Sequence, residues 1–376
     1  MASSSSSTLY KNYPWTQTPL IINGPMAGSA APDLAAAVTN AGGIGFIGGG
    51  VDMAQLGADM DKARSLLAPH IVASLSPSSS SPSDADDTSS ILPIGVGILC
   101  FGAPLAAAAD AIRQHRPAAA WLFAARGDDG NDERYGDYAT WTAAIRAASP
   151  RTAVWIQIGS VGAALAAATS SASPPDVLVA QGADAGGHGF ERGAGIVSLV
   201  PEVGDALADA GVGGVAVVAA GGIAEGRGAA AALALGAGGV VMGTRFLASE
   251  EVGGPAYYGR RVVEARDGGV RTVRSKAFDE AREGGNVWPE LYDGRGLVNR
   301  TYRDFVAGEE VEEIRRLHVE EQKGGKAGAG EVEDMRVTVW AGTGVGLINE
   351  VLPAGKIVED VREGARKVLK SLGAQL

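Results

Sequence analysis

The stretch VAVVAAGGIAEGRGAAAALALGAGGVVMGTR (215–245) indicates the fold of this chain. It holds two short apolar runs, 215–221 and 239–245, and between them an alanine-rich segment, 226–238, that suits a helix. Continuous apolar runs are typical of strands buried on both faces, and a helix between two of them is typical of a parallel crossover. The stretch therefore predicts a strand–helix–strand unit of an α/β protein.

The same rhythm recurs along the chain and gives eight predicted strands. They are 20–26, 43–49, 93–99, 119–125, 152–158, 176–182, 215–221 and 239–245. Helix candidates follow them, among them 51–67 and 33–42, where Asp33 is the expected N-cap. Eight buried strands, each followed by a helix, match a closed barrel better than an open sheet. We predict an α/β fold, a (β/α)8 TIM barrel with a smaller, mainly helical inserted domain.

Two segments interrupt this rhythm. Residues 74–90 are rich in Ser, Pro and Asp and almost free of apolar side chains, so we expect a disordered loop there. From 249 to 334 the charge density rises and the strand pattern stops, which favours a helical insertion, or lid, that covers the substrate site. The barrel would then comprise 15–248 and 335–376, with a last amphipathic helix from about Ala354.

Composition and charge exclude several classes of function. The chain has 376 residues, a formal net charge of −11 and mixed acidic and basic residues, so a nucleic-acid partner is not expected. No apolar run reaches the roughly 18 residues of a membrane span, and the N-terminus lacks a secretory pattern. Cys100 is the single cysteine and is expected to be a core thiol. We expect a cytoplasmic protein without a metal site, a P-loop or a Rossmann dinucleotide fingerprint.

The seventh and eighth strands end in glycines at the place where TIM barrels commonly bind phosphate. Gly221 and Gly222 follow the seventh strand, and Gly243 and Thr244 follow the eighth. Glycines let backbone N–H groups approach an anion, and the helix that begins near Gly226 adds its dipole. The alternative is that these glycines only make tight turns.

The sixth strand runs into GADAGGHG (182–189), which carries His188 beyond the barrel rim. Gly186 and Gly187 permit unusual backbone angles that can aim the imidazole inward, and an imidazole exchanges protons near neutral pH. We predict that His188 is a general base. The alternative is a histidine on a flexible surface loop.

Two further strand ends carry groups that suit a flat cofactor. Gln157 and Gln181 end the fifth and sixth strands, where their amides can bind the edge of a planar heterocycle or can simply pair with loop backbone. The segment Asn23–Met26, with Gly24 and Pro25, ends the first strand. It either forms a backbone wall against the cofactor or is a plain βα turn.

Five motifs in this order resemble the nitronate monooxygenase family, formerly called 2-nitropropane dioxygenases. They are GPMAG (24–28), AGGIGFIG (41–48), VLVAQGADAGGHG (177–189), the stretch 217–250 and WAGTGVGL (340–347). The resemblance implies an FMN-dependent barrel with a late, mainly helical insertion. The matching motifs imply that His188 is the catalytic base. They also imply that the flavin contacts three groups of residues. These are Gly24, Pro25 and Met26; Gln157 and Gln181 with the Gly186–Gly187 pair; and Ala220, Gly221, Gly222, Gly243 and Thr244.

The resemblance implies an enzyme that oxidises alkyl nitronates or nitroalkanes with O2 to a carbonyl compound and nitrite. Two alternatives stay open: an FMN-dependent NAD(P)H oxidoreductase acting on a quinone or an enoyl thioester, and a flavin-holding barrel without turnover. The expected partners are a small-molecule nitronate or nitroalkane and O2, with neither nucleic acid nor membrane. A homodimer is the assembly to test.

Overall fold

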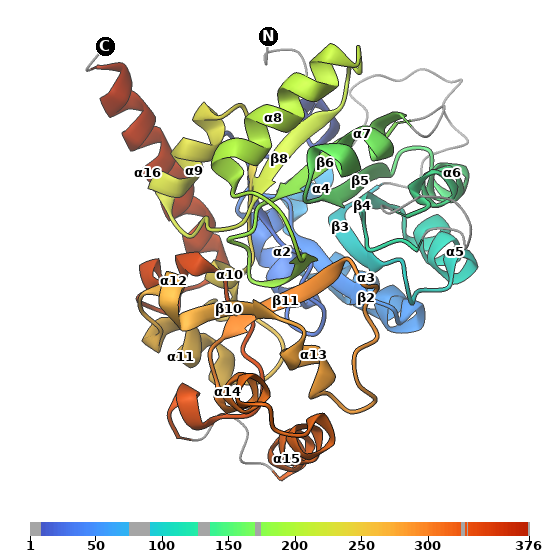
Figure 1. Cartoon of the computed structure of the whole chain (residues 1–376). Coiled ribbons are helices and arrows are strands. Elements are labelled where there is room, and N and C mark those ends of the chain that lie inside the picture. Colours follow the sequence, from blue (N-terminus) through green and yellow to red (C-terminus); the bar gives the residue numbers. More distant parts are fainter. Residues whose placement is uncertain are drawn as a thin grey trace, which may run out of the picture.

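In the computed structural model, eight parallel strands form a barrel and one small antiparallel sheet lies against its mouth (Figure 1). The structure describes residues 9–74, 91–126, 136–169, 174–324, 328 and 330–374. The barrel strands are β1 Ile21–Asn23, β2 Phe46–Gly50, β3 Leu92–Leu99, β4 Pro117–Phe123, β5 Ala153–Ile158, β6 Val177–Gln181, β8 Ala216–Ala220 and β9 Val240–Met242. Each overlaps one of the eight predicted strands, so the predicted fold class is confirmed.

The strands neighbour one another in the order β1-β9-β8-β6-β5-β4-β3-β2, and the two ends of this row meet. An isolated parallel bridge joins Ile22 to Ile44. Asn23 completes the seam, because its Nδ2 donates to the Phe46 carbonyl at 2.8 Å and its Oδ1 accepts from the Phe46 amide at 2.9 Å. A buried side chain thus replaces ladder hydrogen bonds between β1 and β2.

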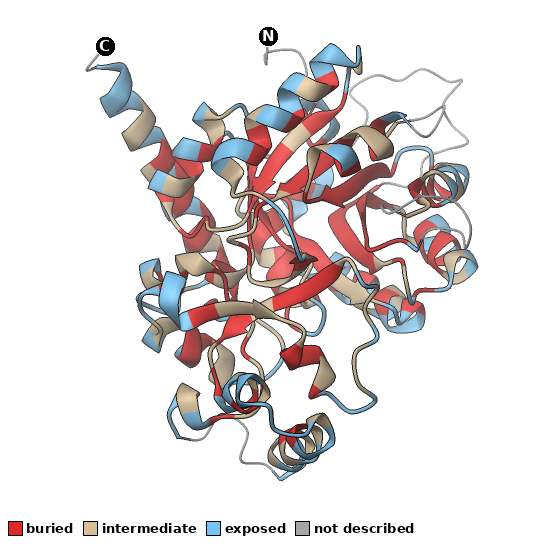
Figure 2. Cartoon of the chain, viewed as in Figure 1, coloured by how far each residue is buried: buried red, intermediate tan, exposed pale blue. Residues whose placement is uncertain are grey.

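Helices follow the strands and form the outer layer of the barrel. They are α2 Pro32–Asn40, α3 Met53–Leu66, α4 Pro69–Ala73, α5 Leu105–His115, α6 Tyr138–Ala148, α7 Val161–Thr169, α8 Ile196–Asp209, α9 Gly226–Ala234 and α16 Ala354–Gly373. Their inner faces are buried and their outer faces exposed (Figure 2). The expectation that Asp33 caps α2 is wrong: Pro32 takes the first helical position, Ala31 is the N-cap, and Asp33 pairs with Lys62.

Aromatic side chains fill the barrel interior. Phe46 of β2 packs against Trp121 of β4 and Trp155 of β5, at centroid distances of 5.2 and 5.1 Å. Since β2 neighbours neither β4 nor β5, the ring of Phe46 can reach the two tryptophans only across the barrel interior. Trp155 donates from Nε1 to the hydroxyl of Tyr13 at 2.8 Å, so the N-terminal segment closes this core. The interior is packed, and any ligand must lie at the mouth.

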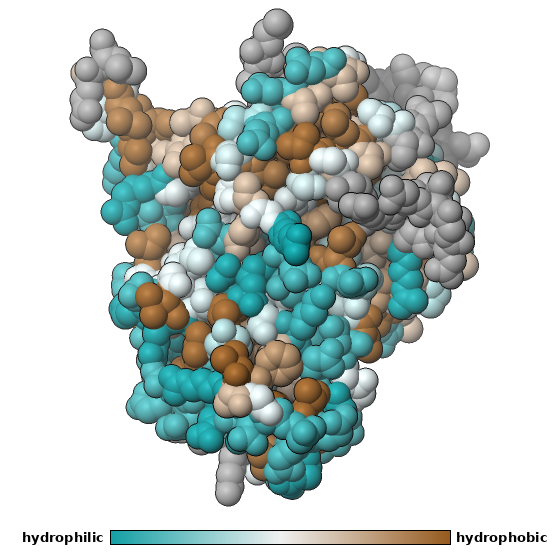
Figure 3. Space-filling model, viewed as in Figure 1, coloured by the Kyte–Doolittle hydropathy of each residue, from teal (hydrophilic) through white to brown (hydrophobic). Residues whose placement is uncertain are grey.

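The predicted insertion contains short helices and two strands. The elements between β9 and α16, of which the first and the last flank the insertion, are α10 Thr244–Leu247, α11 Tyr257–Glu264, α12 Gly268–Arg271, β10 Thr272–Ser275, α13 Ala277–Glu280, β11 Tyr292–Leu297, α14 Arg300–Ala307, α15 Val311–Lys323, and the 3-10 helices η2 Val332–Asp334 and η3 Thr343–Leu347. Strands β10 and β11 form an antiparallel sheet with β7 (Gly187–Phe190), which directly follows barrel strand β6. In Figure 3 the surface at the far end of this region, around α15, is mostly hydrophilic.

The domain boundaries predicted at 248/249 and 334/335 stay predictions. A second apolar cluster includes Val262 and Leu297 from the insertion with Met335, Val337 and Val339. The Leu297 amide donates to the Val339 carbonyl at 2.9 Å, so the chain just after residue 334 packs with the insertion. Of the predicted disordered loop 74–90, all but Ser74 lies outside the described residues.

Candidate active site

His188 lies on strand β7, at the mouth of the barrel. This segment is predicted to be a loop, but it forms an edge strand because β11 of the insertion pairs with it, His188 opposite Gly294. Its flanking glycines are required locally: Gly187 has φ +70°, and a Cβ on Gly189 would meet Gln181 Oε1 at 2.3 Å. The glycines therefore allow β7 to pack closely against the end of β6, and His188 lies beside that strand end.

Three side chains surround the imidazole, and two of them come from the insertion. His188 Nε2 lies 2.9 Å from Oδ1 and 3.0 Å from Oδ2 of Asp279, on α13. Trp288 stacks on the ring at a centroid distance of 3.8 Å and an interplanar angle of 10°, and Trp340 packs at 4.7 Å and 57°. The His188 side chain is 12% exposed and that of Asp279 only 2%, so the pair is shielded from water.

Aromatic side chains extend this wall toward β3 and β4. Trp288 also packs against Phe101 and Phe123, with centroids 4.8 and 5.9 Å away, and Phe123 contacts Tyr292 at 5.0 Å. Phe101 and Phe123 lie at the ends of neighbouring barrel strands. The His188–Asp279 pair is thus a polar group in an apolar, aromatic surrounding, where electrostatic interactions are stronger than in water.

A chain of amide hydrogen bonds links the barrel core to His188. Trp121 Nε1 donates to Gln157 Oε1 at 3.0 Å, and Gln157 Nε2 donates to Gln181 Oε1 at 2.8 Å. Gln181 Nε2 then donates to the His188 carbonyl at 3.1 Å. Gln181 therefore holds the backbone of β7 and Gln157 orients Gln181, and each amide nitrogen keeps one further hydrogen that could reach a ligand.

Arg295 of β11 ties the small sheet to the barrel loop at Ala183, and Arg274 of β10 bonds to β11. Arg295 donates from Nε and Nη2 to the Ala183 carbonyl at 3.2 and 3.1 Å, while Arg274 Nε donates to Asp293 Oδ1 at 2.7 Å. Burial lowers the pKa of the Arg295 guanidinium, and the nearby Arg274 lowers it further, against opposing effects of Asp184 and Asp293. Two cationic side chains therefore lie close to the mouth.

The predicted phosphate residues gather on the neighbouring strand ends, where β8 and β9 lead into Gly221, Gly222, Gly243 and Thr244. Gly221 and Gly222 have φ of +109° and +73°, and a Cβ there would meet Gly182 O at 2.9 Å and Asp184 Cβ at 3.1 Å. These two glycines are needed for close packing of the 182–185 loop whether or not an anion binds. Glu225 caps α9 and accepts from the Gly228 amide at 3.3 Å, so its own carboxylate occupies that helix end.

The other strand ends leave more space. The Gly24 amide donates to the Met242 carbonyl at 2.9 Å, which sets Gly24–Met26 beside the end of β9. A Cβ on Gly243 would meet only Met26 Sδ, at 3.5 Å. Thr244 Oγ1 accepts from the Gly342 amide at 3.0 Å and keeps its own hydroxyl hydrogen to donate. Gly243 therefore has space beside Met26, with Gly24 and Thr244 next to it, and we call these three residues the cradle.

Segment 340–344 connects the cradle to the histidine. The Gly342 amide donates to Thr244 Oγ1. Gly342 also packs closely on Gly186, because a Cβ added to Gly186 would meet the Gly342 nitrogen at 2.4 Å. Thr343 Oγ1 donates to Asp184 Oδ1 at 3.0 Å. The predicted site residues thus belong to one continuous region of the mouth, from Gly24 through Thr244 and Gly186 to His188.

Sequence reasoning missed Asp279 and gave no role to Trp288 or to Trp340 itself. Trp288 stands out among the charged residues of the insertion, and Trp340 begins one of the motifs behind the family resemblance. Asp279 is one of 43 acidic residues and follows no recognisable motif. Only the pairing of β7 with β11 brings it to His188.

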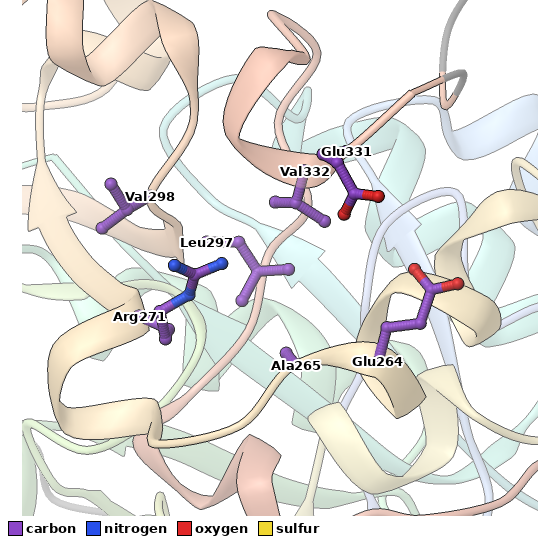
Figure 4. Close-up of a pocket in the computed structure, with 7 residues that line it drawn as sticks. All are labelled: Glu264, Ala265, Arg271, Leu297, Val298, Glu331 and Val332. Carbon is purple, nitrogen blue, oxygen red and sulfur yellow. The ribbon is translucent and has the colours of Figure 1, made fainter.

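A separate hollow of about 60 Å³ lies inside the insertion. Figure 4 shows Arg271 on one side of it and Glu264 and Glu331 on the other, around Leu297. It shares no lining residue with the region around His188. Among the described residues, no group of three His, Cys, Asp or Glu side chains could hold a metal ion, and no helix is long and apolar enough to cross a membrane.

The sequence profile of the nitronate monooxygenase family matches residues 12–92 and 142–364. The chain belongs to the nitronate monooxygenase family. A nitronate monooxygenase of Metarhizium robertsii, npaC, is 47% identical over 98% of this chain and 97% of its own length. One of Neurospora crassa is 38% identical over 96% of this chain and 93% of its own. The chain is therefore an enzyme, an oxidoreductase that acts on a small molecule, as predicted from the motifs.

Solved structures agree with the barrel. FabK from Thermotoga maritima has a TM-score of 0.71 at 25% identity, with 98% of each chain covered. A nitroalkane oxidase from Streptomyces ansochromogenes has a TM-score of 0.69 at 23% identity, with 97% of this chain and 99% of its own covered. The likeness to the oxidase is one of fold. Family membership supports the flavin cofactor that the motifs imply.

Proposed function

We propose that this chain oxidises alkyl nitronates, and the nitroalkanes that give rise to them, with O2 to a carbonyl compound and nitrite, using FMN. The observation that carries the proposal is the position of His188 at the C-terminal mouth of the barrel, between an aromatic wall and the open cradle at Gly243. A base beside a flat cofactor site is the arrangement that proton removal from a nitroalkane requires. The cytoplasmic location and a homodimer stay predictions.

The cradle fits a flavin phosphate and its ribityl chain. Gly24, Gly243 and Thr244 offer backbone and hydroxyl groups, and the space next to Gly243 would be filled by a larger side chain. Pro25 and Met26 would flank the ring system, and Ala220, Gly221 and Gly222 would bound the site on the β8 side, while Gly187 borders it near His188. When bound, FMN supplies the oxidation of the nitronate and the reaction with O2.

The side chains of this protein would handle the substrate and its proton. The aromatic wall of Phe101, Phe123 and Trp288 excludes water from the alkyl group. A ring nitrogen of His188 takes the proton from the carbon that bears the nitro group, and the electron pair of the broken C–H bond moves onto the nitro group. The product of this step is the nitronate anion, and Arg295, whose hydrogen bonds go to neutral oxygens, favours negative charge near the mouth, whereas the charge of Arg274 is offset by Asp293.

Replacement of His188 should affect the neutral nitroalkane and the preformed nitronate differently. His188→Asn should lower kcat/KM for a neutral nitroalkane by about 100-fold or more, because general base catalysis is lost. The preformed nitronate needs no deprotonation, so its kcat/KM should fall far less. Oxygen consumption measures both, and His115→Asn, which alters a histidine paired with Asp61 at the end of α5, is the matched control. Equal losses for both substrates would remove His188 from the role of base.

A further inference from the structure

We propose that Asp279 is a positioning residue that fixes the His188 imidazole as the Nε2–H tautomer and leaves Nδ1 as the atom that accepts the substrate proton. The insertion would then supply part of the catalytic apparatus, although the barrel carries the histidine. The catalytic consequence rests on the proposed function, whereas the tautomer can be measured without any substrate.

The first argument is the geometry of the carboxylate. Both oxygens of Asp279 lie within 3.0 Å of His188 Nε2. An ionised carboxylate only accepts hydrogen bonds, so Nε2 must carry a hydrogen if Asp279 is charged. Arg282 Nη1 lies 3.8 Å from Asp279 Oδ1, so the carboxylate forms an ion pair as well as the contact with His188. The Nε2–H tautomer follows, because a neutral imidazole has one N–H.

The second argument is that packing holds the ring in one orientation. Trp288 covers one face of the imidazole in nearly parallel stacking, and Trp340 contacts it at a steep angle. A 180° flip of the ring would put Cε1 in the place of Nε2 and break the contact with Asp279. Among the described residues no side chain or carbonyl bonds to Nδ1, so this nitrogen is available to a substrate.

The third argument concerns charge during the reaction. When Nδ1 accepts a proton, the imidazole becomes a cation in a place with 12% exposure, where water solvates it poorly. Asp279 lies directly against the Nε2 edge and offsets that charge without itself taking the proton. Deprotonation of a nitroalkane therefore depends on Asp279, whereas oxidation of a preformed nitronate does not.

The test reads the tautomer by NMR of the full-length holoprotein labelled with ring-15N histidine. The chain has only 4 histidines, and the His188→Asn variant identifies the signal of His188. In the neutral form of the ring we expect a protonated Nε2 in the unaltered protein. In Asp279→Asn the population should shift toward Nδ1–H, because an amide can donate to Nε2.

A matched control removes a different buried carboxylate of the insertion. Asp304 bonds to Arg300 and Arg336 and does not contact His188, so Asp304→Asn should leave the His188 signal unchanged. Asp279→Glu keeps the carboxylate and should keep the Nε2–H tautomer. If Asp279→Asn does not fold, the unaltered protein and Asp279→Glu still decide the question.

Kinetics complete the test. Asp279→Asn should lower kcat/KM for a neutral nitroalkane by about 100-fold or more, and that for the nitronate much less. An Nδ1–H tautomer in the unaltered protein, or the same shift in Asp304→Asn, would overturn the proposal. So would equal losses for the two substrates with an unchanged tautomer. Absence of turnover in the unaltered protein would instead count against the proposed function, and the NMR result would stand by itself.

Discussion

At the scale of single residues, the glycines at the strand ends divide into two kinds. Gly221 and Gly222 have positive φ and pack against the 182–185 loop, so side chains there would disturb the backbone itself. Gly243 has a negative φ of −101° and open space next to it. A substitution at Gly243 therefore tests ligand binding, whereas a substitution at Gly222 would mainly test folding.

Gly243→Val should fold normally and bind FMN more weakly. The added methyl groups would enter the cradle between Met26 and Thr244, and a tenfold loss of affinity corresponds to about 1.4 kcal/mol. Titration of the apoprotein with FMN, followed by fluorescence, measures the dissociation constant. Gly204→Val is the control, because a Cβ on this residue of helix α8 would meet no atom within 4 Å and Gly204 does not belong to the proposed site. Unchanged affinity in Gly243→Val would place the phosphate elsewhere.

The position of a site residue could be predicted where the neighbouring sequence indicates a strand or a tight turn. His188 could be placed at the mouth because it follows a recognisable apolar strand, and the glycines around it indicated a close approach of the backbone. Asp279 could not be placed, because its partner lies 91 residues away and an acidic residue in a charged segment is usually solvated.

At the scale of elements, the barrel depends on the seam between β1 and β2. This seam has one isolated backbone bridge, and Asn23 supplies the remaining hydrogen bonds to Phe46. The alternative interpretation of the Asn23–Met26 segment as a plain turn therefore overlooked a structural role for its first residue.

Asn23→Leu should destabilise the protein by about 2 kcal/mol or more. The substitution leaves the buried amide and carbonyl of Phe46 without partners, and each unpaired group costs about 1–3 kcal/mol. Urea unfolding followed by circular dichroism gives the free energy of unfolding. Asn349→Leu, at an exposed residue, is the control. A change below about 0.5 kcal/mol in Asn23→Leu would mean that water or a shifted strand closes the seam equally well.

The barrel strands could be predicted because each is a continuous apolar run, but the second sheet could not. Strands β7, β10 and β11 read GHGF, TVRS and YDGRGL, which are polar or glycine-rich and lack a period of two. They form because they pair with one another over the mouth, which is a tertiary effect that local patterns do not contain.

At the scale of the whole molecule, two parts of the chain build one site. The barrel supplies His188, the chain of amide hydrogen bonds through Gln157 and Gln181, and the cradle, while the insertion supplies Asp279 and Trp288. The insertion contacts His188, and that it covers the substrate site stays a prediction. Its internal arrangement follows from the β7–β11 pairing rather than from its own sequence pattern.

The most direct measurement is the visible absorbance spectrum of the purified protein under anaerobic conditions, before and after addition of an alkyl nitronate and, separately, of NADPH. We expect a flavin spectrum that the nitronate bleaches and NADPH leaves unchanged, because we propose that the site binds an anionic nitro compound beside His188. Bleaching by NADPH but not by the nitronate would contradict nitronate oxidation and favour a reductase. A colourless protein that does not take up FMN would contradict the cofactor site at Gly243 and Thr244.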